Sequence, residues 1–226
     1  PWLGAVGLWD PWEPEYSEVG RMMIVRGDWV HPYYRDAYFF SKPVLPFWLS
    51  ALGMAAVGAN SGDRALGIYT EWGIRTPYAV LMIAGAALVY LAAGRLLGRR
   101  VGLVAAFGTL TSPLYFLIAR QAITDTPFVA LLTMGMACHA MAAFGGDDVR
   151  PRWLYAGYAL FGLATLSKGL LGLAIPAGAW LAYFVITWDW RLLPRLRPFT
   201  GTLTTLAVCA PWYGAMIAFD GVDDES

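Results

Sequence analysis

WLYAGYALFGLATLSKGLLGLAIPAGAWLAYFVIT, residues 153–187, is the stretch that decides the fold. An α-helix needs roughly 17 to 25 residues to cross the hydrocarbon core of a bilayer, so this run is long enough for two passes. Ser167, Lys168 and Gly169 interrupt it near the middle, and Pro176 is expected to kink the second half. The stretch therefore predicts two membrane helices joined at a polar break that carries a lysine.

Further apolar runs are also long enough to form membrane helices, and they cover residues 77–94, 101–118, 127–144 and 199–217. No strand alternation competes with helix, because backbone in lipid must satisfy its own hydrogen bonds. Hydrophobic residues make up 58% of the chain and charged residues 14%, too little polar surface for a soluble globule. The sequence predicts an all-α fold, a polytopic transmembrane helical bundle with six passes in a bacterial inner or plasma membrane.

Charge and cysteine usage exclude other classes. The formal net charge is zero and no basic stripe with interleaved aromatic residues appears, so nucleic acid is not an expected partner. Cys138 and Cys209 lie inside apolar runs, far from any second sulfur, and are interpreted as small buried apolar residues.

The run at residues 44–58 is short for a membrane span. If it lies at the interface instead of crossing, eight arginines of the later loops fall on the cytoplasmic side, against Arg120 and Lys168 outside. Basic residues in short loops prefer the cytoplasm, so this orientation is favoured. It predicts an extracytoplasmic region with juxtamembrane helices over residues 1–76 and a membrane domain over residues 77–226. The polar candidates for chemistry then share the outer face.

The opening sequence concentrates carboxylates, namely Asp10, Glu13, Glu15 and Glu18, ahead of an amphipathic stretch. One interpretation is structural, because carboxylates near a helix start favour the positive end of its dipole. The other is catalytic, because a carboxylate near lipid is suited to remove a proton from an acceptor hydroxyl as general base.

Only two of the 16 basic residues are lysines, Lys42 and Lys168, and each lies where polar sequence gives way to an apolar run. A lysine at the end of a membrane helix often extends its charge to the interface without binding anything. Two ammonium groups at the membrane edge also fit a phosphate site.

Arg120 and Asp125 stand between two predicted spans, where they would form an ion pair on a cavity wall or where Asp125 would cap the next helix. His139 lies in an apolar run and is interpreted as a core residue. His31 with a nearby carboxylate is a weak metal candidate.

Taken together, these strings resemble the polyprenyl-phosphate-dependent membrane glycosyltransferases, which include protein mannosyltransferases and lipid A aminoarabinose transferases. The resemblance covers nearly the whole chain. The motifs that carry it occur in the family's order, and they are Glu13 with Tyr16, Glu18, Arg21 and Met22; Gly27, Asp28, Trp29 and Pro32; Lys42 and Pro43; Arg120 and Asp125; Ser167, Lys168 and Gly169; and Pro211, Trp212 and Tyr213.

The resemblance implies a sugar donor linked to a polyprenyl phosphate, with the phosphate near Lys168 and Lys42, assisted by Arg120. A hydroxyl of a lipid, glycan or protein would be the acceptor, and transfer would proceed with inversion at the outer face. The catalytic carboxylates implied are Asp10, then Glu13, with Asp125 beside them.

The chain departs from the family pattern at two points. The family's acidic pair is adjacent, whereas here Trp12 precedes Glu13 and the nearest upstream carboxylate is Asp10. Some members carry Glu before the Lys-Pro pair, where this chain has Ser41, so their metal site does not carry over. A divalent metal is left as an optional cofactor without assigned ligands. The family pattern also implies a membrane helix before Pro1 and further spans after Ser226.

Two other classes compete with the enzyme. A transporter or lipid flippase would use the break at Ser167 and the polar groups as a substrate path. Its ionisable residues are expected near the bilayer midplane, whereas here they concentrate at the outer boundary. A purely structural membrane subunit leaves the acidic opening and both lysines without a role.

Overall fold

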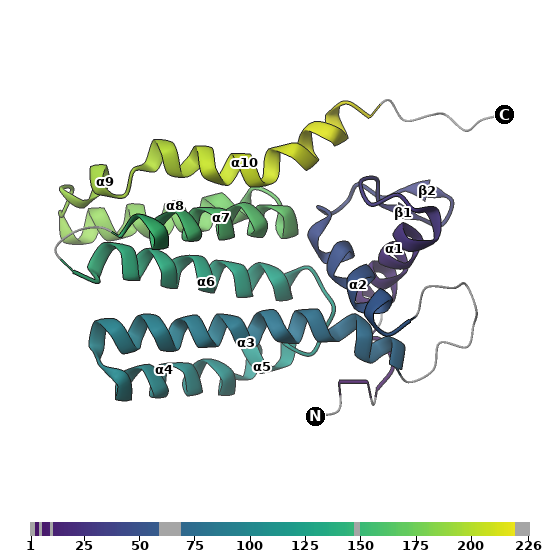
Figure 1. The fold of residues 1–226 in the computed structure, drawn as a ribbon, viewed down its shortest axis with the longest axis horizontal. Helices are drawn as coiled ribbons and strands as arrows, with labels where there is room; N and C mark the ends of the chain where they lie inside the picture. The colour runs from purple at the N-terminus through teal and green to yellow at the C-terminus, as the bar shows by residue number, and fades with distance from the viewer. Residues whose placement is uncertain (1–2, 5, 10, 59–68, 147–149, 220–226) are drawn as a thin grey trace.

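The computed structural model describes residues 3–4, 6–9, 11–58, 69–146 and 150–219, and it is a bundle of long helices with a smaller unit at one end (Figure 1). The bundle contains α3 (Tyr69–Leu97), α4 (Arg99–Thr111), α5 (Pro113–Ile118), α6 (Asp125–Phe144), α7 (Pro151–Lys168), α8 (Leu171–Thr187), α9 (Leu192–Arg195) and α10 (Pro198–Ile217). The unit at its end, here called the cap, contains α1 (Trp12–Arg26), β1 (Tyr33–Tyr34), β2 (Ala37–Tyr38) and α2 (Leu45–Ala56).

The bundle helices follow the apolar runs closely. The run at 153–187 divides into α7 and α8 at Gly169, whose positive φ of 72° ends α7 in a conformation that glycine adopts readily. The run at 101–118 is two helices rather than one, because Ser112 is extended and Pro113 starts α5 in the first helical turn. The fold class predicted from the sequence is confirmed.

Within the described residues, two helices are long and apolar enough to cross a membrane, Thr70–Leu97 and Asp125–Phe144. Two shorter apolar helices are Leu45–Ala56 and Leu171–Thr187. Helix α3 continues without a break through residue 76, where the sequence placed a domain boundary. The interfacial position of residues 44–58 stays a prediction.

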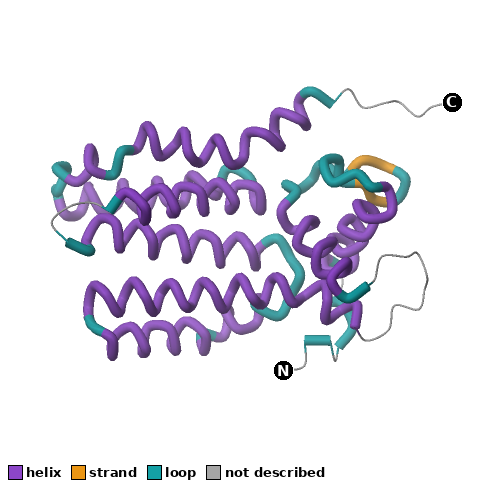
Figure 2. The backbone as a smooth tube through the Cα atoms, viewed as in Figure 1, coloured by secondary structure: helices purple, strands orange, loops and turns teal. Residues whose placement is uncertain are grey.

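The β-hairpin was not expected from the sequence. Its two strands pair Tyr33 with Tyr38 and Tyr34 with Ala37, and Figure 2 shows them in orange in the cap. Arg35 and Asp36 both have positive φ, which is the turn that matches the twist of a two-residue hairpin. The strands are too short to show an alternating pattern.

An apolar cluster joins the cap to α7 and α10. Tyr16, Val19 and Met23 of α1 pack with Phe47 of α2 and with residues of α7 and α10, namely Leu166, Cys209 and Trp212. The Trp212 indole N–H donates a hydrogen bond of 2.9 Å to the Val30 carbonyl, which holds the loop after α1 against α10. The core therefore fixes the cap over the ends of α7 and α10.

Helices α2 and α3 cross at two glycines. A Cβ atom built on Gly53 would lie 2.1 Å from the Gly73 carbonyl oxygen, closer than any real Cβ contact. We expect Gly53→Ala to lower the free energy of unfolding by about 1–3 kcal/mol, because the helices must separate. Gly108→Ala on α4 is the control, since a Cβ there meets nothing within 4 Å. Unfolding in detergent should separate the two variants; equal stabilities would contradict a tight crossing.

Candidate functional site

Lys168 and Asp125 form an ion pair where two bundle helices meet the cap. Asp125 lies in the first turn of α6 and Lys168 in the last turn of α7, so each charge also complements its helix dipole. The side chain of Asp125 is 44% exposed and that of Lys168 is 30% exposed. The Lys168 ammonium lies 5.7 Å from the centre of the Phe128 ring. A partly open cation and carboxylate therefore face the boundary between cap and bundle.

The backbone around this pair is fixed from both sides. The Ser167 hydroxyl donates a hydrogen bond of 2.9 Å to the Thr124 carbonyl, so the residues before Lys168 and Asp125 are joined directly. The Tyr213 hydroxyl of α10 donates to the Thr165 carbonyl at 3.2 Å. It is also the nearest group to a Cβ built on Gly169, at 4.0 Å. The glycine thus leaves its backbone accessible next to Lys168.

Helix α1 brings further acidic groups to the same place. Burial raises the pKa of the Tyr16 phenol, and the carboxylates of Glu15 and Asp125 raise it further. The phenol therefore lies within electrostatic range of both carboxylates. Glu15 of α1 and Asp125 of the ion pair therefore belong to one region of the molecule.

Glu13 lies in the wall of this region rather than on its surface. Its side chain is fully buried and forms an ion pair with Arg75 of α3, with nitrogen-to-oxygen distances of 2.7 and 2.9 Å. The backbone N–H groups of Trp9 and Ala122 each donate to it at 2.7 Å. With these four hydrogen bonds, both carboxylate oxygens are engaged by the protein.

The sequence analysis did not identify Arg75, although its ion pair with Glu13 explains why that carboxylate is buried. Its guanidinium also donates to the carbonyls of Leu3, Val6 and Gly7 at 2.6–2.9 Å, so all its N–H groups have partners. The pair ties the N-terminal segment and α1 to α3 and to the loop before Asp125. An arginine at the start of a membrane helix was the only signal in the sequence, and it does not identify a partner 62 residues away.

Lys42 follows the hairpin and is partly buried. Two residues later, Val44 is fully buried in the cluster that contains Leu166, which itself stands two residues before Lys168. The packing therefore anchors the segment that carries Lys42 next to the end of α7.

Arg120 lies elsewhere. Its guanidinium is 5.8 Å from the centre of the Phe116 ring, and it lines a cleft with Trp9, Arg75 and Gln121. The cation that pairs with the Asp125 carboxylate is thus Lys168, whereas the sequence analysis proposed Arg120 for that ion pair. Asp10, the first choice for the base, lies outside the described residues.

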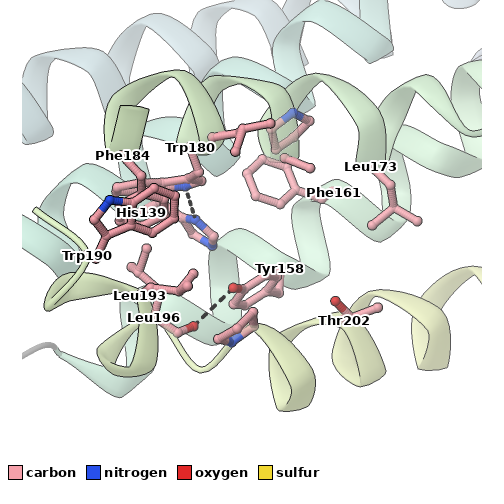
Figure 3. A pocket seen from close by; sticks show the side chains of 14 residues that line it. His139, Tyr158, Phe161, Leu173, Trp180, Phe184, Trp190, Leu193, Leu196 and Thr202 are labelled. Atoms are coloured by element: carbon pink, nitrogen blue, oxygen red, sulfur yellow. Dashed lines mark hydrogen bonds between the residues drawn. The ribbon is translucent and has the colours of Figure 1, made fainter. Parts of the chain in front are cut away.

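The two histidines have different surroundings. His139 is buried, and its Nδ1 accepts a hydrogen bond of 3.0 Å from the Trp180 indole. It therefore carries its proton on Nε2 when neutral, and Nε2 has no hydrogen-bond partner in the described structure. Figure 3 shows it in the wall of an apolar cavity of about 290 Å³, lined mostly by aromatic and aliphatic side chains of α6 to α10. His139 is a core residue, as predicted.

His31 lies in the cap, where its ring stacks on Phe219 with centroids 4.1 Å apart and its Nδ1 is 2.9 Å from an Asp28 oxygen. The part of the chain that the structure describes contains no group of three or more His, Cys, Asp or Glu side chains able to hold a metal ion.

Asp28 organises the loop after α1 and makes its stability depend on pH. Partial burial acts to raise the pKa of this carboxyl, but hydrogen bonds from the backbone of His31 and Val30 and from the His31 ring lower it below the ordinary 3.8. The stabilisation is therefore present above pH 3.8 and is lost as the pH falls through the folded-state value. We expect thermal unfolding in detergent to shift less between pH 6 and about pH 3 in Asp28→Asn than in the wild type. An unchanged pH dependence in the variant would contradict this role.

Comparison with known proteins identifies the family. Residues 41–214 match the family described as dolichyl-phosphate-mannose-protein mannosyltransferase. The chain belongs to this family. The match begins just before Lys42 and includes the Lys168–Asp125 pair, so the ion pair is part of a mannosyltransferase-family fold, and the resemblance stated from the motifs is confirmed.

Curated relatives of the chain include aminoarabinose transferases. The chain is 30% identical over 210 residues to an undecaprenyl phosphate-alpha-4-amino-4-deoxy-L-arabinose arabinosyl transferase of Edwardsiella ictaluri, covering 91% of this chain. It is 31% identical over 212 residues to the protein of the same name from Pseudomonas aeruginosa, again over 91% of this chain. The chain spans about 36% of the length of each of these relatives.

The fold matches solved structures of ArnT from Cupriavidus metallidurans at 27% sequence identity. The TM-score is 0.85 for the apo state, over 93% of this chain and 38% of that one. It is 0.87 for the state bound to undecaprenyl phosphate, over 96% of this chain and 38% of that one.

Proposed function

We propose that this chain forms part of a membrane glycosyltransferase that moves a sugar from a polyprenyl-phosphate donor to an acceptor hydroxyl. The observation that carries the proposal is the Lys168–Asp125 pair at adjoining helix ends, in a chain of this family and with the fold of a protein solved with undecaprenyl phosphate. The proposal rests on a cation and a carboxylate at one accessible point, which is what phosphate binding and proton transfer require.

Lys168 is proposed to bind the donor phosphate, with Lys42 as the second cation. Before the donor arrives, Asp125 neutralises and orients the ammonium; the phosphate then competes with Asp125 for it. As the bond between sugar and phosphate breaks, negative charge grows on the leaving phosphate. A cation fixed beside it stabilises that charge more in the transition state than in the bound donor. Gly169 leaves room for the phosphate to approach the backbone.

The proposed base is Asp10, because the other upstream carboxylate, Glu13, is already engaged by Arg75 and two backbone N–H groups. The carboxylate of Asp10 takes the proton of the acceptor hydroxyl while the acceptor oxygen attacks the anomeric carbon. The bond from that carbon to the phosphate oxygen breaks on the opposite side, so polyprenyl phosphate leaves and the configuration inverts. Asp125 is proposed to act on Lys168 rather than as the base.

The side of the membrane is also part of the proposal. The arginine distribution supports an extracytoplasmic position for the cap, Lys42 and the Lys168–Asp125 pair. The acceptor, a hydroxyl of a lipid, glycan or protein, would then enter from outside the cell, and the donor chain would stay in the bilayer.

A donor-turnover assay tests this function. The purified protein, in detergent with polyprenyl-phosphate sugar labelled in the sugar, should release unlabelled polyprenyl phosphate and transfer or hydrolyse the sugar. Asp10→Asn should abolish this, while Glu18→Gln on the exposed side of α1 should keep it. Donor that is bound and carried across a vesicle membrane without being consumed would support a transporter and overturn the enzyme.

A further inference from the structure

Helix α1 carries a stripe of apolar side chains, Trp12, Tyr16, Val19 and Met23, at the spacing that places them on one face. Tyr16, Val19 and Met23 are buried in the cluster that α1 forms with α2, α7 and α10, and none of them is more than 4% exposed. Trp12 belongs to the same stripe one turn earlier, yet its side chain is 54% exposed. The stripe therefore begins with an aromatic ring that the described part of the chain leaves largely uncovered.

The Trp12 ring stands beside the ion pair of the proposed phosphate site. Its indole stacks on the Tyr16 ring, with centroids 6.2 Å apart and planes inclined by 21°. Tyr16 packs in the cluster that contains Leu166, two positions before Lys168. The pKa of the Tyr16 phenol, raised first by burial, is raised further by the Asp125 carboxylate. Trp12 and Tyr16 thus form an aromatic wall next to the cation and carboxylate.

Two polar groups on this face are available to a ligand. Glu15 lies three residues after Trp12, so the two side chains are neighbours on the helix surface. The Glu15 carboxylate is partly buried and has no ion pair or hydrogen bond within the described residues. The Tyr16 hydroxyl has no hydrogen-bond partner there either, yet it is not one of the enclosed unpaired atoms, so its oxygen is accessible.

This combination suits a sugar. A carboxylate accepts hydrogen bonds from sugar hydroxyls, and a phenol hydroxyl donates or accepts them. The face of an aromatic ring is electron-rich and attracts the weakly positive C–H groups of a sugar ring.

We propose that Trp12, Glu15 and Tyr16 bind the sugar of the donor, with the sugar ring against the open face of Trp12 and its hydroxyls at Glu15 and Tyr16. The inference rests on the proposed transfer reaction and deepens it, because it assigns a sugar subsite within the same site. The sugar is bonded directly to the phosphate, so a phosphate held at Lys168 brings the sugar to the aromatic wall. A lipid tail would use the ring but neither polar group.

Equilibrium binding to the purified protein in detergent tests the subsite. The probes are undecaprenyl phosphate and the same lipid carrying either mannose or 4-amino-4-deoxy-L-arabinose. The wild type should bind at least one sugar-bearing lipid more tightly than undecaprenyl phosphate. Trp12→Leu should weaken binding of that lipid about threefold to tenfold, the effect of losing one aromatic contact, and should leave undecaprenyl phosphate unchanged. Trp12→Phe should lie between the two, because it keeps a smaller aromatic face.

Trp9→Leu is the matched control. Trp9 is 56% exposed, close to the value for Trp12, but its side chain lines the cleft with Arg75 and Arg120. This variant should bind all the probes like the wild type. Tyr16→Phe tests the polar part and keeps the ring. Because the hydroxyl has no partner within the described residues, the free energy of unfolding should not fall, whereas the sugar-bearing lipid should bind more weakly.

The three probes separate the subsite from the phosphate site. Equal weakening of undecaprenyl phosphate and the sugar-bearing lipid in Trp12→Leu would make Trp12 a lipid contact and overturn the sugar subsite. Sugar-bearing lipids that bind the wild type no more tightly than undecaprenyl phosphate would also overturn it, while the phosphate site at Lys168 would stand. A wild type that binds none of the three lipids would overturn the proposed function itself, and the subsite with it.

Discussion

Replacing Lys168 with Met should lower the rate of sugar transfer about 10²–10³-fold, the usual cost of removing one group that stabilises charge in a transition state. Met keeps the length and apolar character of the lysine stem, so the cluster around Leu166 should stay packed. Asp125 remains at its helix N-terminus, where the dipole favours a carboxylate without a counterion. The loss should therefore appear in kcat measured with labelled polyprenyl-phosphate sugar, and not in the free energy of unfolding.

Arg152→Gln is the control for Lys168→Met. Arg152 is an exposed basic residue on the same helix, at its opposite end, and its removal should leave kcat within a factor of two or so. Lys168→Arg should recover part of the activity, because charge is kept while the compact ammonium is lost. If Lys168→Met transfers sugar like the wild type, the phosphate site proposed here is wrong.

Replacing Glu13 with Ala should lower the free energy of unfolding by about 3–5 kcal/mol, the range seen when one partner of a buried ion pair is removed. The Arg75 charge would be left 4% exposed without a counterion, and the N–H groups of Trp9 and Ala122 would lose their acceptor. The measurement is unfolding in mixed micelles of mild detergent and sodium dodecyl sulfate.

Glu18→Ala on the same helix is the comparison. Glu18 also pairs with an arginine, Arg21, at 2.6 Å, but the two side chains are 38% and 31% exposed. Exposed pairs contribute less than about 1 kcal/mol, so this variant should unfold close to the wild type. Glu13→Gln separates structure from catalysis: full stability with no transfer would make Glu13 the base and contradict its structural role.

The long helices were predictable because lipid leaves few alternatives. Apolar run length and the polar break at Ser167 located α7 and α8, and the arginine pattern proposed a side for each loop. Pro113 marked the division between α4 and α5 in the sequence. The continuous apolar run nevertheless led to the prediction of a single helix over residues 101–118. The hairpin was not visible, since two-residue strands carry no period.

The sequence predicted which residues form the site better than it predicted which of them form ion pairs. The sequence predicted Lys168 and Asp125 at the same membrane boundary. It proposed Arg120, which is near Asp125 in the sequence, as the ion-pair partner of Asp125. The antiparallel packing of α6 on α7 brings Lys168 to it instead, across 43 residues. Glu13 looked reactive because sequence shows a carboxylate and not its burial. Its character depends on Arg75, and only the fold brings the two together.

Helix α3 has a mechanical consequence for the whole molecule. Its 29 residues reach about 43 Å, whereas a bilayer's hydrocarbon core is about 30 Å thick, so part of the same rod stands clear of the lipid. The protruding end of α3 carries Arg75 and packs against α2. The cap is therefore attached rigidly to a membrane helix. Helix α3 therefore holds the cap at a constant height above the lipid.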